Sequence, residues 1–189
     1  MGGVNCSVVA YLPEPLGEFV DGLRRRLNPR FAHWRPHVSI LPPRMLSQTP
    51  ELSQAPEDLL DPVREQCMVL DPFEATLSEV QTFWPVNGVV YLAIARGSDR
   101  LTEFHQRLNS GGLARVEPYP YVPHVTIAQE LDEAETQAVL QEASREWSRY
   151  AGTPTFRVES LALVRQEPDQ RWTDLAPLLL GGALKPSRR

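Results

Sequence analysis

Cysteine is scarce in this 189-residue chain, which contains only Cys6 and Cys67. Two cysteines are too few for a disulfide framework, and they lack the close spacing of a metal-binding pair. We expect both thiols to be reduced, as is typical of a protein of the cytoplasm.

Long hydrophobic runs are also missing. The longest apolar stretch near the C-terminus, residues 175–184, is too short to cross a bilayer and contains a proline and two glycines. The N-terminus lacks a basic stretch followed by a long apolar run, and Glu14 and Pro15 interrupt it early. We therefore expect a cytoplasmic protein with no membrane partner.

An excess of positive charge is absent as well. The chain has 19 Lys and Arg against 24 Asp and Glu, which gives a net charge of −5 and a pI near 5.4. A protein that coats long nucleic acids by phosphate attraction needs a broad basic surface. The charge balance argues against that class of protein, but it permits a small basic cleft that holds one phosphate or one chain end.

The remaining composition is that of an ordinary globular protein, with 42% hydrophobic and 23% charged residues. A chain of this length can bury a substantial core, either as one domain or as two small lobes. We interpret residues 1–189 as a single domain.

One short phrase occurs twice in the chain. Residues 36–40 read PHVSI and residues 123–127 read PHVTI, 87 positions later (123 − 36). Alternate residues of a strand share a face, so His37 and Ser39 should point one way, and His124 and Thr126 should also point one way together. Two imidazoles, each beside a hydroxyl, are the groups that acid–base chemistry at a phosphate requires.

The order of elements around the two phrases also repeats. Hydrophobic periodicity predicts strand–helix–strand–helix–strand twice, with the histidine phrase as the third element of each half. We place the halves at residues 4–84 and 88–165, followed by a C-terminal strand and tail at 170–189. The expected strands are 4–12, 36–41, 73–83, 88–95, 123–127, 156–164 and 172–180, and the expected helices are 16–27, 56–68, 101–108 and 133–147.

Local signals mark several boundaries of these elements. Pro42 and Pro43 are expected to end the first histidine strand, and residues 44–56 read as a polar loop. Asp132 is the expected N-cap of the last helix. An internal duplication explains the repeat most simply. Two facing lobes would then place His37 and His124 on opposite walls of one cleft.

The doubled Pro-His-apolar-hydroxyl-Ile phrase, at matching places in a duplicated chain, resembles the 2H phosphoesterase superfamily. Within it the closest likeness is to the bacterial and archaeal 2′-5′ RNA ligase or RNA 2′,3′-cyclic phosphodiesterase group. The resemblance covers roughly residues 4–165. It implies an α+β fold in which a duplicated β-α-β-α-β unit forms two pseudo-symmetric lobes. Their antiparallel sheets would surround a central cleft, with the helices outside.

The resemblance also implies an activity, the opening of 2′,3′-cyclic phosphate ends of RNA or nucleotides, with 2′-5′ joining of RNA ends as the reverse reaction. With an ordinary pKa of about 6.5, one imidazole can be the base and the other the acid at neutral pH. By analogy with the family, His124 would be the base and His37 the acid. Ser39 and Thr126 would donate hydrogen bonds to the phosphate oxygens. We expect no cofactor and no metal, and a monomer.

Several other residues are candidates for substrate contacts. Arg44 follows the first phrase and Arg165 ends the last matching strand, so either could hold a phosphate. Tyr121 precedes the second phrase and Trp84 lies at the join of the halves, so either ring could stack on a base. His33 and His105 lack the phrase, and we expect both to be structural or exposed.

Three other functions stay open at this point. The same mechanism could act on a small cyclic nucleotide or on an ADP-ribose cyclic phosphate. A non-catalytic nucleotide- or RNA-binding module could retain the groove, although such a module would not need two acid–base groups. A purely structural domain with accidental repeats is the remaining alternative.

Overall fold

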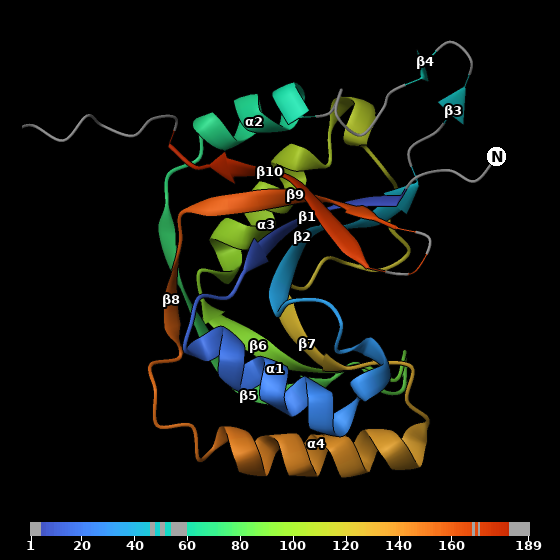
Figure 1. The fold of residues 1–189 in the computed structure, drawn as a ribbon, viewed down its shortest axis with the longest axis vertical. Coiled ribbons are helices and arrows are strands. Elements are labelled where there is room, and N and C mark those ends of the chain that lie inside the picture. The colour runs from blue at the N-terminus through green and yellow to red at the C-terminus, as the bar shows by residue number, and fades with distance from the viewer. Residues whose placement is uncertain are drawn as a thin grey trace, which may run out of the picture.

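The computed structural model describes residues 5–45, 48–49, 52–53, 60–167, 169 and 171–181. Within these residues, helices cover an antiparallel sheet of eight strands (Figure 1). The helices are α1 (Leu16–Leu27), α2 (Leu60–Met68), α3 (Ser98–Leu108) and α4 (Glu133–Trp147), with short 3-10 turns at Pro29–Phe31 and Gly111–Leu113.

The eight strands are joined in the order β10-β9-β1-β2-β7-β6-β5-β8. Their bounds are β1 Asn5–Tyr11, β2 His37–Met45, β5 Phe73–Thr82, β6 Val90–Arg96, β7 His124–Ala128, β8 Thr155–Val158, β9 Ser160–Gln166 and β10 Trp172–Leu179. A separate pair, β3 (Gln48–Thr49) and β4 (Leu52–Ser53), lies inside the segment predicted to be a loop.

The fold confirms the predicted class, an α+β arrangement built on a repeated element order. The chain runs β1-α1-β2-α2-β5 and then β6-α3-β7-α4. The pairing, however, exchanges strands between the two halves of the sequence. β5 pairs with β6 of the second half, and β9 pairs with β1 of the first half. The two half-sheets, β10-β9-β1-β2 and β7-β6-β5-β8, are joined into one sheet by β2 and β7.

The strand predicted at residues 156–164 is broken at Glu159. β8 pairs with β5 at one edge of the sheet, whereas β9 pairs with β1 near the opposite edge. Glu159 and Ser160 are both exposed between the buried Val158 and Leu161, so the alternation of inward and outward residues is interrupted here. Because one residue connects an edge strand to the strand next to the opposite edge, the sheet must curl into a half-barrel.

The first histidine strand does not end at Pro42 and Pro43, because β2 continues to Met45. A proline cannot donate to a ladder and is tolerated at sheet edges and bulges. The register of β1 with β2 passes from Leu41 to Arg44, so the two prolines occupy the interval between paired residues. The predicted start of the following helix, residues 56–59, lies outside the described residues, as does the tail at 185–189.

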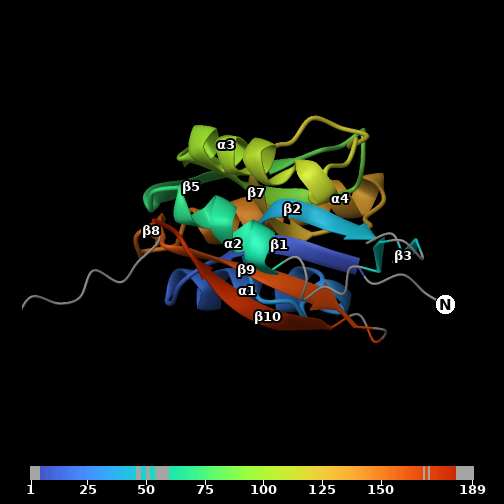
Figure 2. The same ribbon diagram turned by 90° about the horizontal axis from the view of Figure 1, so that it is seen from above.

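The helices pack around one hydrophobic core that contains residues of both half-sheets. α1 contacts α4 and β7, α4 contacts β5 and β6, α3 contacts β2 and β6, and α2 contacts β10. Seen from above, the strands β10, β9, β1 and β2 fan across one another, with α3 above them in the view (Figure 2). The predicted cap of α4 is confirmed, since the Asp132 carboxylate accepts from the Glu135 amide at 2.8 Å in a capping box.

No helix in the described part of the chain has the length and hydrophobicity that a membrane span requires.

Candidate active site

The two histidine phrases meet in the middle of the sheet. β2 pairs antiparallel with β7 through Val38 and Val125. Both valines are completely buried and belong to the main core. Because successive side chains of a strand alternate between faces, the residues on either side of each valine must point to the opposite face of the sheet.

The register then decides which polar residues face each other. In an antiparallel ladder centred on the valine pair, His37 stands opposite Thr126 and Ser39 stands opposite His124. Directly opposed residues have Cβ atoms about 5 Å apart, and diagonal neighbours lie about 7–8 Å apart. The two histidines therefore lie on one diagonal of a small rectangle, and the two hydroxyl residues occupy the other diagonal.

Each histidine is oriented by a carbonyl of the residue two positions earlier. His37 Nδ1 lies 2.6 Å from the Arg35 carbonyl oxygen, and His124 Nδ1 lies 2.7 Å from the Val122 carbonyl oxygen. A carbonyl can only accept a hydrogen bond, so Nδ1 carries the proton in both rings. The neutral rings consequently present Nε2 as a proton acceptor, and the same atom is the donor once the ring is protonated.

Aromatic side chains surround both imidazoles. The His37 ring centroid lies 4.7 Å from that of Trp172 and makes an edge contact with Tyr11 at 6.4 Å. The His124 ring lies 5.1 Å from both Phe83 and Tyr91. These rings remove water from the histidines and leave few polar groups to solvate a charged imidazole.

The removal of water shifts the pKa of both histidines downward. Burial lowers the pKa of His37 to about 4 against the opposing effect of the Arg35 carbonyl, and the positive charges of Arg24 and His124 lower it further. Burial also lowers the pKa of His124, with the Val122 carbonyl acting in the opposite direction. Both rings are therefore neutral at pH 7 in the ligand-free protein. An anion between them would favour protonation of one ring.

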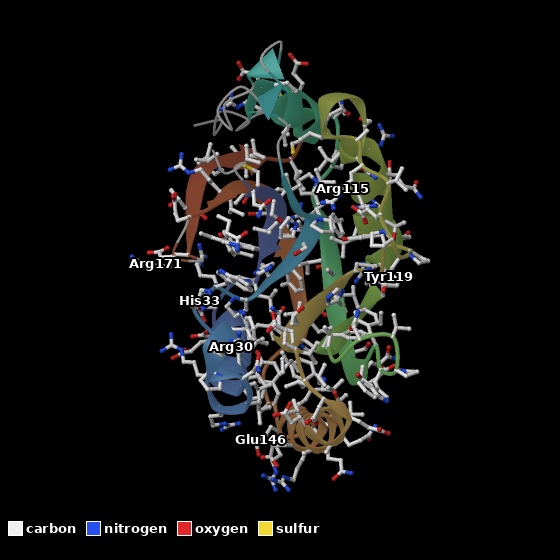
Figure 3. All side chains as sticks on the ribbon, turned by 90° about the vertical axis from the view of Figure 1, so that its right-hand side faces the viewer. Arg30, His33, Arg115, Tyr119, Glu146 and Arg171 are labelled. Atoms are coloured by element: carbon white, nitrogen blue, oxygen red, sulfur yellow. The ribbon has the colours of Figure 1, made fainter. Side chains whose placement is uncertain are left out.

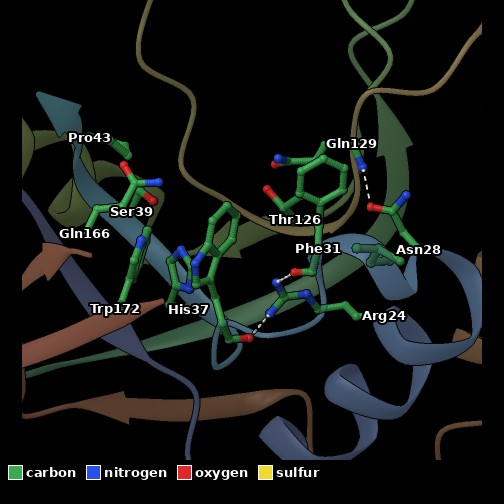
Figure 4. A pocket seen from close by; sticks show the side chains of 12 residues that line it. Arg24, Asn28, Phe31, His37, Ser39, Pro43, Thr126, Gln129, Gln166 and Trp172 are labelled. Atoms are coloured by element: carbon green, nitrogen blue, oxygen red, sulfur yellow. Dashed lines mark hydrogen bonds between the residues drawn. The ribbon is translucent and has the colours of Figure 1, made fainter. Parts of the chain in front are cut away.

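Two cavities open on this face, one beside each histidine. The cavity beside His37 has a volume of about 180 Å³ and is lined by both polar and aromatic side chains (Figure 4). It is lined by Arg24, Asn28, Phe31, Trp34, His37, Ser39, Pro43, Thr126, Ile127, Gln129, Gln166 and Trp172. The cavity beside His124 has a volume of about 510 Å³ and is rich in aromatic residues and proline. It is lined by Ser39, Pro42, Pro43, Phe83, Val86, Asn87, Arg115, Glu117, Pro118, Tyr119, Pro120, Tyr121, Val122 and His124.

Ser39 and Pro43 line both cavities, so the two cavities adjoin at these residues. The two sides can be followed in Figure 3, where Arg115 and Tyr119 lie on one side of the central strands and His33 and Arg171 lie on the other. A phosphate between the two histidines would thus have a compartment on each side.

The other candidates from the sequence have different surroundings. Tyr121 lines the larger cavity, but its hydroxyl is already engaged, since it donates to the Ser39 carbonyl at 2.8 Å. Arg165 forms a two-pronged ion pair with Glu167 and is not among the described residues that line either cavity. Trp84 is likewise absent from both linings. The backbone of Arg44 lies in β2, and its side chain is outside the described part of the structure.

Sequence reasoning missed most of the smaller cavity. Gln166, rather than its neighbour Arg165, shares the groove face with Ala162 and Val164 of β9. The alternation of side-chain direction along β9 could have predicted this, because residues 162, 164 and 166 share one face of the strand. Trp172 opens the strand that was placed outside the repeat, and Trp34 stacks on it at 5.2 Å.

Among the described residues, no group of three or more His, Cys, Asp and Glu side chains could hold a metal ion.

Comparison with known proteins agrees with this arrangement. The family model of the 2′-5′ RNA ligase superfamily matches residues 12–170. A Halalkalibacterium halodurans protein, named for a proposed phosphoesterase activity, is 31% identical over 128 residues, which cover 68% of this chain and 71% of that protein. A protein of the same description from Oceanobacillus iheyensis is 27% identical over 175 residues, covering 93% of this chain and 97% of that one.

Solved structures show the same fold. Escherichia coli LigT complexed with 3′-AMP superimposes with a TM-score of 0.64 at 17% identity, covering 95% of this chain and 99% of LigT. A Thermus thermophilus protein superimposes with a TM-score of 0.54 at 20% identity, covering 95% of this chain and all of that one. At these identities the likeness concerns the fold alone.

Proposed function

The chain belongs to the 2′-5′ RNA ligase superfamily, and from this membership we propose that it is a metal-independent phosphodiesterase that opens 2′,3′-cyclic phosphate ends of RNA or nucleotides. The observation that carries the proposal is the diagonal placement of His37 and His124, with Ser39 and Thr126 on the other diagonal. Phosphoesterase activity in a broader sense also fits the names of the relatives.

The proposed reaction uses the two Nε2 atoms on opposite sides of one phosphorus. Water attacks in line, a new P–O bond forms, and the bond to one ribose oxygen breaks. One imidazole takes the proton of the water, and the other, protonated, gives its proton to the departing ribose oxygen. The product is a phosphate monoester, expected at the 2′ position. Both proton transfers are supplied by side chains, so the chemistry has no need of a metal.

The hydroxyls of Ser39 and Thr126 are placed to serve the non-bridging oxygens. Each lies two residues after a histidine of its own strand and therefore on the same face of the sheet. Each also stands opposite the histidine of the other strand. Negative charge grows on those oxygens in the transition state, and donors fixed in advance stabilise it. The single negative charge of a cyclic phosphate would also favour protonation of one neighbouring imidazole, which supplies the acid that the ligand-free site lacks.

The larger cavity supports a nucleotide substrate. Val86, Tyr119 and Val122 are large apolar residues with 62%, 58% and 44% of their surface exposed, and all three line this cavity. Phe83 also lines this cavity, and its ring makes an edge contact with that of His124, with centroids 5.1 Å apart. Such a surface suits a nucleobase, because every base has a flat face that can stack on an aromatic ring. Escherichia coli LigT has been solved with 3′-AMP, a nucleotide.

Substrate turnover in the presence of EDTA tests the proposal. The protein would be incubated with 2′,3′-cyclic AMP, with an oligonucleotide ending in a 2′,3′-cyclic phosphate, and with an ADP-ribose cyclic phosphate. We expect monoester product from at least one of the first two, unaffected by EDTA. Activity that EDTA abolishes and a divalent metal restores would contradict the mechanism.

The same protein and substrates separate three further functions. Joining of a cyclic-phosphate end to a 5′-hydroxyl RNA would show the reverse, 2′-5′ ligase reaction. Tight binding of the cyclic nucleotide without any turnover would identify a non-catalytic binding module, and preference for the ADP-ribose compound would identify the small-molecule alternative.

A further inference from the structure

Arg24 and His105 occupy equivalent places in the two halves of the molecule. Each lies three positions before the last residue of its helix, α1 or α3, and its carbonyl accepts from the capping asparagine amide at 2.8 Å. The helices end in the same Arg-Leu-Asn sequence, at residues 26–28 and 107–109. Arg24 is 4% exposed and His105 is 7% exposed, which makes them two of the few buried polar side chains in the described residues.

Arg24 holds the segment that leads to His37. Its guanidinium donates to the Trp34 carbonyl at 2.7 Å and to the Phe31 carbonyl at 2.9 Å (Figure 4). The residue after Trp34 is Arg35, whose carbonyl accepts from His37 Nδ1. The buried Arg24 guanidinium thus fixes two backbone carbonyls of the loop just before Arg35, whose carbonyl orients His37.

His105 holds the segment that leads to His124. Its ring stacks on Tyr121 with centroids 4.0 Å apart and planes inclined by only 2°. The residue after Tyr121 is Val122, whose carbonyl accepts from His124 Nδ1. The second half therefore repeats the scheme of the first, with a ring contact in place of the guanidinium bonds.

His105 also reaches across to the strand that carries the first histidine. Its Nδ1 lies 2.8 Å from the Ile40 carbonyl, and the Tyr121 hydroxyl donates to the Ser39 carbonyl at 2.8 Å. The register of β1 with β2 skips Ile40, because Ser39 and Leu41 face the consecutive residues Val9 and Val8. Ile40 is thus the extra residue of a β-bulge, and a bulge re-aims the side chains beside it.

We propose that Arg24 and His105 are pseudo-symmetric positioning residues for the two active-site histidines. Arg24 sets the Arg35 carbonyl and so the tautomer and direction of His37. His105, with Tyr121, sets the Val122 carbonyl for His124 and fixes the bulge that aims Ser39. The role in turnover rests on the proposed function, whereas the orientation of the rings does not.

Arg24→Met removes the guanidinium hydrogen bonds, and His105→Leu removes both the ring that stacks on Tyr121 and the hydrogen bond to Ile40. Arg25→Met and Arg107→Met are matched controls, because these residues lie on the same helices with 71% and 49% of their side chains exposed. Tyr121→Phe removes only the donation to Ser39. Arg24→Lys replaces Arg24→Met if the latter fails to fold, because a single ammonium cannot reproduce a fork that spans two carbonyls.

The ring nitrogens of the histidines are followed by ¹⁵N NMR, and turnover of 2′,3′-cyclic AMP is measured in parallel. We expect Arg24→Met to disturb the Nδ1–H signal of His37 while leaving that of His124, and His105→Leu to disturb the signal of His124 while leaving that of His37. The kcat of each should fall by about tenfold or more with a small change in KM, as expected when a reacting group is misplaced. The controls should match the wild type.

Unchanged tautomer signals in both variants would overturn the proposal, as would a kcat that falls while both signals are preserved. Equal disturbance of both histidines by either variant would also overturn it, because that pattern indicates general loosening of the fold. Selective loss of the ring signals in a protein that turns over no cyclic phosphate would support the positioning roles and contradict the proposed function instead.

Discussion

Val38 of β2 pairs with Val125 of β7 at the centre of the eight-stranded sheet, and neither side chain is exposed. This one pair joins the two half-sheets and sets the register of everything around it. If either strand shifted by one residue, its histidine would turn into the core and its valine into the groove, so the two histidines would lie on opposite faces of the sheet. The buried pair is therefore the element that keeps two acid–base groups together on one face.

Protein stability should fall on acidification in the ligand-free state. The unfolded His37 imidazole takes up a proton near pH 6.5, whereas the folded one does so only near pH 4, so between these values the unfolded state binds more protons. The contribution of the neutral His37 ring to the free energy of unfolding is fully present above pH 6.5, and it is lost as the pH falls from 6.5 to about 4. Urea unfolding at pH 7 and pH 5 checks this, and His37→Asn should lose less stability over the same interval. Equal losses in both proteins would contradict the assigned pKa.

Loss of the aromatic ring beside His124 should weaken substrate binding. Phe83→Ala removes a face on which a base can stack, an interaction worth about 1–3 kcal/mol per base. We expect KM for 2′,3′-cyclic AMP to rise about tenfold, with a smaller change in kcat. Val116→Ala is the control, because Val116 is 95% exposed and is not among the residues lining the larger cavity. Equal KM values for Phe83→Ala and the wild type would place the base elsewhere.

Two glycines should respond to alanine in opposite directions. A Cβ on Gly88 would lie 1.8 Å from the Leu131 carbonyl oxygen, a backbone atom that cannot move aside alone, whereas a Cβ on Gly22 would meet no atom within 4 Å. Gly22 lies inside α1 and is exposed, so Gly22→Ala should stabilise the protein by about 0.5–1 kcal/mol. Gly88→Ala should destabilise it by at least about 1–3 kcal/mol. Thermal unfolding of both variants measures the two effects.

Phosphate should raise the pKa of at least one active-site histidine. Burial lowers the pKa of both rings in the ligand-free protein, and a bound anion favours the charged form. An NMR titration of the histidines with and without inorganic phosphate should show the rise in pKa on His37 or His124. Identical titration curves in the two conditions would mean that no anion binds between them.

The sequence predicted that each histidine shares a face with its hydroxyl residue because the side chains of a strand alternate between its two faces. His37 and Ser39 alternate with buried residues, and so do His124 and Thr126, so their common direction follows from the period of two alone. The same rule could have selected Gln166 over Arg165. It could not show that Glu159 breaks the last strand, since that break depends on pairing with strands far away in the sequence.

The surroundings of Arg24, His105 and Trp172 could not be predicted either, because they also depend on the tertiary fold. Arg24 reads as one of three consecutive arginines on a helix, and only the fold shows that its side chain turns inward to two carbonyls. His105 lies in a helical stripe, and its contact with Ile40 spans 65 positions. Trp172 was placed in a strand outside the repeat, yet pairing of β10 with β9 brings it to His37.

The most direct test of the two-histidine account is the single-turnover rate on an oligonucleotide ending in a 2′,3′-cyclic phosphate, measured in EDTA for the wild type, His37→Ala and His124→Ala. Each substitution removes one of the two proton transfers, so we predict that each rate falls by about 10² or more while thermal stability and substrate binding are retained. A rate close to that of the wild type in either folded variant would contradict the account.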